Sequence, residues 1–291
     1  MTEDQKRIAL LRQIWATLEK LHIVTYFVRE CRDAYKSLGV ENVWSRYFAG
    51  RAAPMGRVTY ETIVATFYNF SPSMVKEHAE SVWEAAGPES FVSARFRGAD
   101  NALQRLLGEY INFPEIGTVP SLVYDIALKG SPEGKPIYSA NLGVSVPDKL
   151  HLKLFHAATL VREYKGDIHN SILLSSDVSG LQAHILLSSI GHMSKEKVLS
   201  SRGWSEQQWL MDQRNLQSRG LLGEDGLLSQ DGLAFRVEIE GKTETLAAKL
   251  WDNLDDKALG EINESLSPLN RQLSISKELP NFTPTYEDLI K

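Results

Sequence analysis

The sequence has a single cysteine, Cys31, which excludes a disulfide framework and a metal site held by several thiolates. It also lacks an apolar run of the roughly 18 residues that would span a bilayer. Charges occupy the beginning of the chain, where a secretory signal would need an apolar stretch. These absences predict a cytoplasmic protein with no membrane partner.

Familiar catalytic motifs are missing as well. The chain has no glycine-rich phosphate loop, no nucleophile elbow around a serine and no His-Glu-x-x-His sequence. The 291 residues are 43% hydrophobic and 24% charged, which is typical of a folded globular protein rather than a disordered or fibrous chain. This length predicts two domains of ordinary size or one large domain.

Apolar residues recur three and four positions apart through most of the first hundred residues, which predicts helices. Residues 108–150 are instead punctuated by proline and glycine, which is typical of a connecting region. We therefore expect a helical domain with its linker over 1–145. The second domain is expected over 146–291, including a C-terminal tail.

The C-terminal half contains the most informative pattern. A helix is predicted over 205–219 and ends at Gly220; short strands are predicted at 226–228 and 234–240, with a turn at 230–232. Helix, strand, tight turn and strand follow one another in this order in a winged helix-turn-helix. The expected fold is therefore mostly α, with a helical N-terminal domain and a winged-helix-like C-terminal domain that carries a small β-wing.

Several stretches resemble a known family. They are YFAGRAAPMG (47–56), FYNFSPSMV (67–75), HAATLVREYKGDIH (156–169), RGWSEQQW (202–209) and RGLLGEDGLLSQDG (219–232). Together they resemble a largely actinobacterial family of helix-turn-helix proteins, and the last is similar to the start of the wing in MarR-type regulators. The resemblance implies the two-part fold above and no particular activity. Tyr164 and Lys165 stand where the family usually has His-Arg, which removes one candidate ligand or acid–base group.

The densest polar cluster comprises His156, Arg162, Glu163, Asp167 and His169. With Asp167 starting a new helix, His169 would lie near a helix N-terminus, where the dipole favours neutral imidazole. Neutral histidine suits a divalent metal, a haem iron or a general base, so His156 and His169 are candidate metal ligands. Together with Glu163 they are also candidate catalytic residues. The alternative is structural: a solvated Arg-Glu pair, a helix cap and a packing histidine.

A second candidate is Arg51, which lies in the turn sequence GRAAPMG. Its guanidinium could bind a carboxylate or phosphate of a ligand, or could pair with an acidic residue on a neighbouring helix. Tyr47, Phe67 and Phe70 belong to an aromatic concentration that would either form core or line an apolar pocket between the halves. Arg51, Arg162 and these aromatic residues are the candidate ligand-binding set.

The distribution of charge argues against DNA as a partner. Residues 1–150 are balanced, so the whole net charge of −5 falls in the half that resembles a DNA-binding module. The predicted wing carries Glu224, Asp225, Asp231, Glu238 and Glu240, whereas DNA-binding wings place basic side chains on phosphates.

Three functions remain open from the sequence. The leading one is a cytoplasmic protein that binds a small molecule between its two halves, with or without catalysis. The alternatives are a ligand-responsive transcription regulator and a haem- or metal-dependent enzyme using His156 and His169. The apolar faces predicted on helices 5–38 and 243–265 also allow a homodimer.

Overall fold

The computed structural model describes residues 3–112 and 117–280, and over this part the chain is built from α-helices with short 3-10 turns. The first helices are α1 (Glu3–Phe27), α2 (Arg29–Lys36), α3 (Val43–Ala52), α4 (Tyr60–Phe67), α5 (Pro72–Ala79), α6 (Val82–Ala85), α7 (Pro88–Leu107) and α8 (Val119–Ala127). They are followed by α9 (Pro136–Leu142), α10 (Leu150–Ser175), α11 (Gly180–Ser188), α12 (Lys195–Arg202), α13 (Glu206–Ser218), α14 (Gln230–Ala248) and α15 (Asp256–Ile275). The 3-10 turns are η1 (Ala53–Met55), η2 (Gly108–Asn112) and η3 (Lys249–Trp251).

Serine side chains begin several of these helices. The Ser71 hydroxyl accepts a hydrogen bond from the Met74 backbone N–H at the start of α5, where Pro72 takes the first helical position. Ser179 and Gln182 form a reciprocal capping box at the start of α11, and Ser205 does the same for α13. These helix starts are set by local sequence alone.

The predicted β-wing is wrong. Over the residues described the chain contains no strand, and the expected first strand is reduced to one antiparallel bridge between Leu222 and Leu228. The expected second strand, 234–240, lies inside α14. The C-terminal half is therefore all-α in its described part, and the mostly-α prediction holds without the wing.

The helical conformation of α14 has two identifiable causes. Ser229 caps the helix by accepting from the Gly232 backbone N–H at 2.9 Å, and Arg236–Glu240 and Glu238–Lys242 are ion pairs one helical turn apart. The buried positions include Arg236, Glu240 and Glu244, of which the first two occupy polar positions of the predicted strand. When these charged residues are treated as inward-facing, the segment shows the three- and four-residue spacing of a helix rather than the two-residue alternation of a strand.

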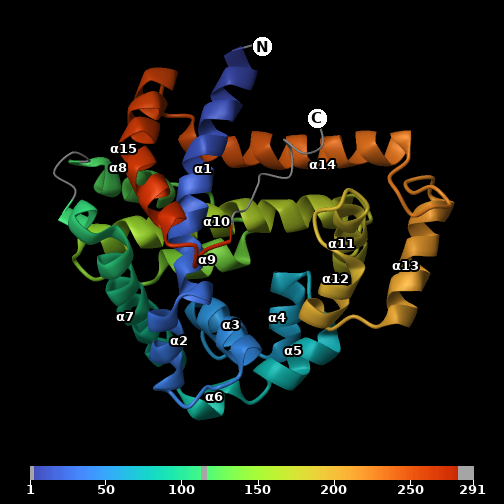
Figure 1. Cartoon of the computed structure of the whole chain (residues 1–291), viewed down its shortest axis with the longest axis horizontal. Coiled ribbons are helices and arrows are strands. Elements are labelled where there is room, and N and C mark those ends of the chain that lie inside the picture. The colour runs from blue at the N-terminus through green and yellow to red at the C-terminus, as the bar shows by residue number, and fades with distance from the viewer. Residues whose placement is uncertain (1–2, 113–116, 281–291) are drawn as a thin grey trace.

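Helix α10 runs through the centre of the molecule, with α1 crossing it and α14 lying alongside (Figure 1). The sequence predicts a break at Gly166 and Asp167, but the helix continues through both residues to Ser175. The part of α10 from Leu152 to Leu173 is buried on almost every side. A helix in this position must satisfy its polar side chains with partners from other helices.

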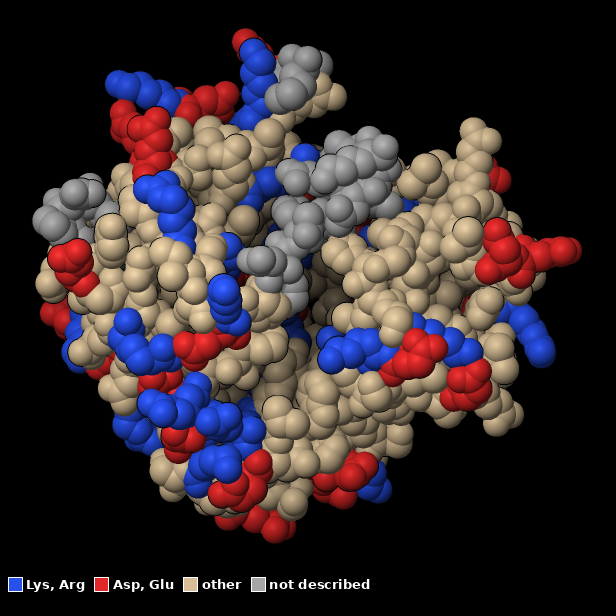
Figure 2. Space-filling view, in the orientation of Figure 1, with Lys and Arg blue, Asp and Glu red and all other residues tan. Residues whose placement is uncertain are grey.

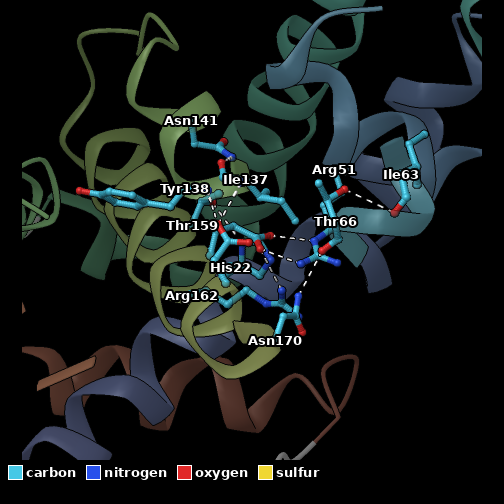
Figure 3. Close-up of polar contacts among 12 residues, drawn as sticks. His22, Arg51, Ile63, Thr66, Ile137, Tyr138, Asn141, Thr159, Arg162 and Asn170 are labelled. Atoms are coloured by element: carbon cyan, nitrogen blue, oxygen red, sulfur yellow. Dashed lines mark hydrogen bonds and ion pairs between the residues drawn. The ribbon is translucent and has the colours of Figure 1, made fainter. Parts of the chain in front are cut away.

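Asp167 is a buried polar residue of α10 whose partners come from another helix. Its carboxylate accepts hydrogen bonds from the backbone N–H groups of Ile137 and Tyr138, each at 2.9 Å, at the start of α9 (Figure 3). The residue expected to cap its own helix thus caps a different one. The two donors belong to the first turn of α9, where no intrahelical acceptor exists.

The apolar faces of the terminal helices are buried within the chain. Helix α15 packs against α1, and the larger core joins residues on both sides of position 145, including Leu18, Phe155 and Leu266. The boundary at 145 remains a prediction. Across the described helices, none is long and apolar enough to cross a membrane. The C-terminal tail is helical as far as Ile275, and the expected loose order of 281–291 lies outside the described residues.

Replacing Asp167 by alanine tests the inter-helix cap. We expect Asp167→Ala to lower the free energy of unfolding by about 1–3 kcal/mol, because two buried N–H groups lose their acceptor. Chemical denaturation followed by circular dichroism measures the change. Asp148→Ala is the matched control, because Asp148 is exposed and should leave stability nearly unchanged. Equal stabilities for Asp167→Ala and wild type would contradict the cap.

Candidate functional site

A cavity of about 420 Å³ lies between α1, α10, α11 and α14. Its apolar wall is formed by Trp15, Leu18, Ala158, Val161, Ala183 and Leu187. The face drawn in Figure 2 is hollowed near its centre, and basic side chains lie along the edge of the hollow. A volume of this size suits a small organic molecule.

Charged side chains also line the cavity, and the basic ones outnumber the acidic ones. The basic residues are Arg12, Lys20, Arg162, Lys165 and Arg236, whereas the acidic ones are Glu19 and Glu240. Arg12 forms two hydrogen bonds with the Glu244 carboxylate, at 2.8 and 2.6 Å. The ammonium of Lys165 lies 4.1 Å from the centre of the Trp15 ring, a cation–π contact that holds it at the wall.

Two of the lining side chains are buried with polar atoms that have no hydrogen-bond partner. Arg236 is 1% exposed, and its Nε and one terminal nitrogen make no hydrogen bond, although that nitrogen lies 3.0 Å from a Glu240 oxygen as an ion pair. His184 is also buried, and neither ring nitrogen makes a hydrogen bond. Burial lowers the pKa of His184 to about 4, so its imidazole is neutral at physiological pH.

His169 lies in the same cavity, in the interior of α10. Its Nδ1 is 3.1 Å from the Thr243 hydroxyl of α14, which ties the two helices together. Burial lowers the pKa of His169. The sequence predicts a neutral imidazole from a nearby helix N-terminus, whereas in the structure burial is the cause.

The cavity wall also holds groups capable of exchanging a proton. Burial raises the pKa of Glu19, and the nearby Arg162, at 3.8 Å, only partly opposes it. His169 and His184 add two imidazole groups to the same wall.

Metal binding finds no support in the described residues. No group of three or more His, Cys, Asp or Glu side chains in that part of the chain is placed to hold a metal ion. His156 and His169 are separated by 13 positions on one continuous helix. At about 1.5 Å of rise per residue they cannot share an ion. The Nε2 of His156 donates to the Asn141 carbonyl at 3.0 Å, and His156 does not line the cavity.

Behind the cavity wall, Arg51 and Glu163 form a buried ion pair (Figure 3). Two nitrogens of Arg51 donate to the two oxygens of Glu163, at 2.9 and 2.7 Å. The guanidinium also lies 4.3 Å from the centre of the Phe67 ring. Arg162 adds a hydrogen bond of 3.2 Å to Glu163 and so connects this pair to the cavity. Arg51 therefore bonds to a neighbouring helix, which is the second of the two alternatives that the sequence leaves open.

A buried histidine that sequence reasoning missed lies close to this pair. The Nδ1 of His22 is 3.1 Å from the Thr159 hydroxyl, and its Nε2 is 3.2 Å from the Tyr26 hydroxyl. Burial lowers its pKa well below the ordinary value. His22 lies in an apolar helical stretch with no motif around it, so the sequence offers no signal for it.

The predicted site residues are only partly brought together. Arg162 and His169 line the cavity. The others lie outside its lining: His156, Glu163, Arg51, Tyr47, Phe67 and Phe70. Phe67 and Phe70 belong to the smaller hydrophobic core, and Tyr47 packs against it.

Four important lining residues, Glu19, Lys165, His184 and Arg236, were not among the predicted site residues.

Helices α12 and α13 form a second notable unit. They are joined by a three-residue turn in which Gly203 has a φ of 71°, in the left-handed region. A Cβ at Gly203 would lie 2.5 Å from the Cβ of Met74, so glycine is required where this turn meets α5. The Trp204 indole donates to the Asn69 carbonyl at 3.1 Å and fixes the same junction. Two helices joined by a short glycine turn have the form of a helix-turn-helix.

The all-α scaffold and the α12–α13 unit together define a helix-turn-helix class of protein. A family model described as the helix-turn-helix family matches residues 11–280, and the chain belongs to that family. No curated protein and no solved structure matches the chain. The actinobacterial and MarR-type features of the resemblance remain predictions.

Glu163→Gln tests the buried ion pair. Burial would raise the pKa of Glu163, but Arg51 and Arg162 outweigh it and lower the pKa well below 4.5. The pair therefore stabilises the fold above pH 4.5, and this contribution is lost as pH falls toward the folded-state pKa. We expect Glu163→Gln to lose about 3–5 kcal/mol at pH 7. Its unfolding free energy should also fall less steeply below pH 4.5 than that of wild type.

Denaturant titrations at several pH values measure both effects. Glu41→Gln is the control, because it removes a carboxylate from an exposed ion pair with Lys36 and should change little. The double variant Arg51→Met, Glu163→Leu should regain much of the stability, since it leaves no unpaired buried charge. An unchanged acid slope in Glu163→Gln would refute the assignment.

Proposed function

We propose that this protein binds a small molecule in the cavity between α1, α10, α11 and α14. The observation that supports this most directly is the cavity itself, about 420 Å³ in volume and bordered by helices from both ends of the sequence. It combines an apolar wall with a few charged and imidazole groups, and this combination is typical of ligand sites.

The way the fold builds this space also supports a binding role. Helix α1 contributes Trp15 and Glu19, α10 contributes Lys165 and His169, and α14 contributes Arg236. Contacts between these helices are already present at the cavity wall, for example between Arg12 and Glu244 and between His169 and Thr243. A wall that is fixed in the absence of ligand costs little to order on binding.

A cavity-filling substitution tests this function. Ala16 is half-buried in α1 and lines the cavity, so a phenylalanine there should occupy the ligand space. We expect wild type to bind at least one of octanoate, octyl phosphate, octanol and octylamine with one-to-one stoichiometry. Ala16→Phe should weaken that binding about 10-fold or more, as measured by native mass spectrometry and isothermal titration calorimetry.

Ala65→Phe is the matched control, because Ala65 is exposed on α4 and does not line the cavity. It should bind as wild type does. Absence of binding by every compound in the panel would overturn the proposed function, as would wild-type affinity in Ala16→Phe.

The α12–α13 unit and the family match favour a second candidate, a ligand-responsive DNA-binding regulator. Helix α13 carries two acidic side chains, Glu206 and Asp212, and one basic side chain, Arg214. A second basic residue, Arg219, follows at the C-cap. The face in Figure 2 likewise shows basic and acidic side chains interspersed, without a broad basic surface. Since phosphate contacts supply most affinity for DNA, small-molecule binding remains the favoured function.

A gel-shift assay separates the two candidates. We expect no retardation of the DNA upstream of the protein's own coding sequence at about 50 mM salt, because α13 supplies no excess positive charge. A cavity ligand from the panel should not change this result. A shifted band at low salt that disappears at about 200 mM salt would favour the regulator instead.

A further inference from the structure

We infer that the ligand of this cavity carries an anionic head, a carboxylate or a phosphate, on an apolar body, and that Arg236 and Lys165 bind the head. The inference rests on the proposed function and adds the chemical class of the ligand. It starts from the composition of the wall, where five basic side chains face two acidic ones among the described residues. Glu244 neutralises one of the five, Arg12, and an excess of positive charge remains.

Arg236 gives the most specific indication. Its guanidinium is 1% exposed, yet it lines the cavity, and two of its nitrogens make no hydrogen bond. Buried donors without acceptors are costly, and native proteins usually satisfy them with protein, water or ligand. Glu240 offers an oxygen 3.0 Å from one of these nitrogens, so Nε is the donor that is left without any partner. The planar fork of a guanidinium matches the two oxygens of a carboxylate or phosphate.

The surroundings of Arg236 place further donors within the same part of the cavity. The contact between His169 and Thr243 holds α10 against α14, one helical turn from Glu240 and two turns from Arg236. Lys165 lies one turn from His169 on α10, with its ammonium held over Trp15. Guanidinium and ammonium thus converge on the cavity from adjacent helices, as in sites that bind a charged head.

The rest of the wall suits an apolar body. Leu18, Ala158, Val161, Ala183 and Leu187 offer no hydrogen-bonding side chain to a ligand. A bound ion without an apolar portion would leave these apolar side chains in contact with water. An amphiphile with one negative end satisfies both parts of the wall.

A series of compounds with one chain and different heads tests the inference. Octanoate and octyl phosphate supply anionic heads, octanol is neutral and octylamine is cationic. We expect wild type to bind at least one anion about 10-fold or more tightly than octanol, and octylamine to bind most weakly. Whichever anion binds tighter identifies the head as carboxylate or phosphate. Isothermal titration calorimetry measures the affinities.

Substitutions of Lys165 and Arg236 then test whether these residues bind the anionic head. Lys165→Met keeps an apolar stem over Trp15, and Arg236→Gln removes the guanidinium. Each should weaken binding of the preferred anion about 10-fold while leaving octanol affinity nearly unchanged. Because Arg236→Gln leaves Glu240 unpaired, Arg236→Gln combined with Glu240→Gln provides a version without that buried charge. Lys242→Gln is the matched control, since Lys242 is exposed on the same helix and outside the lining.

The outcomes separate this inference from the proposed function. Octanol or octylamine binding as tightly as both anions would overturn the anionic head while preserving a ligand cavity. Anion binding that is unchanged in Lys165→Met and in the Arg236 variants would overturn the assigned residues. Failure of all four compounds to bind would remove the proposed function, and the inference with it.

Discussion

The structure depends on the burial of α10 along most of its length. A helix at the centre of a protein cannot leave polar side chains unpaired, because each would lose its hydrogen bonds to water without replacement. Along α10 the partners come from different helices: His22 of α1 for Thr159, Arg51 of α3 for Glu163, the first turn of α9 for Asp167, and Thr243 of α14 for His169. The polar residues of α10 therefore determine which helices surround it.

The cavity follows from the same arrangement. Helix α1 contacts α10 through His22 and Thr159, α14 contacts α10 through Thr243 and His169, and α1 contacts α14 through Arg12 and Glu244. Gly180 contributes from the other end of the molecule, where a Cβ would lie 2.0 Å from the Tyr68 carbonyl oxygen and push α11 away. Close approach of the backbone there brings His184 and Asn69 to the cavity wall. The cavity is thus a consequence of where the helices are attached.

Local signals made part of this fold predictable. Serine caps such as Ser179 and Ser205 act on the N–H groups of their own helix, so their effect is contained in a few residues. The break expected at Gly166 and Asp167 failed for the opposite reason. Both residues disfavour a helix interior, but the burial of α10 and the acceptor role of Asp167 toward α9 outweigh that preference. No local pattern contains this long-range contact.

The candidate site was harder to predict because its most informative residues look like surface residues in the sequence. Arg236 and Glu240 fell on polar positions of the predicted strand 234–240, so the first half of α14 was missed with them, whereas Glu244 fell within the predicted helix 243–265. In the structure all three are buried, and only Glu244 has a complete partner, in Arg12. Buried charge that a protein does not fully satisfy internally is expensive to keep. The simplest explanation for the unsatisfied guanidinium of Arg236 at the cavity wall is a ligand that supplies hydrogen-bond acceptors to it. The helix-turn-helix family therefore describes the scaffold of this chain, whereas the ligand that we propose for it is argued from the buried charge on α14.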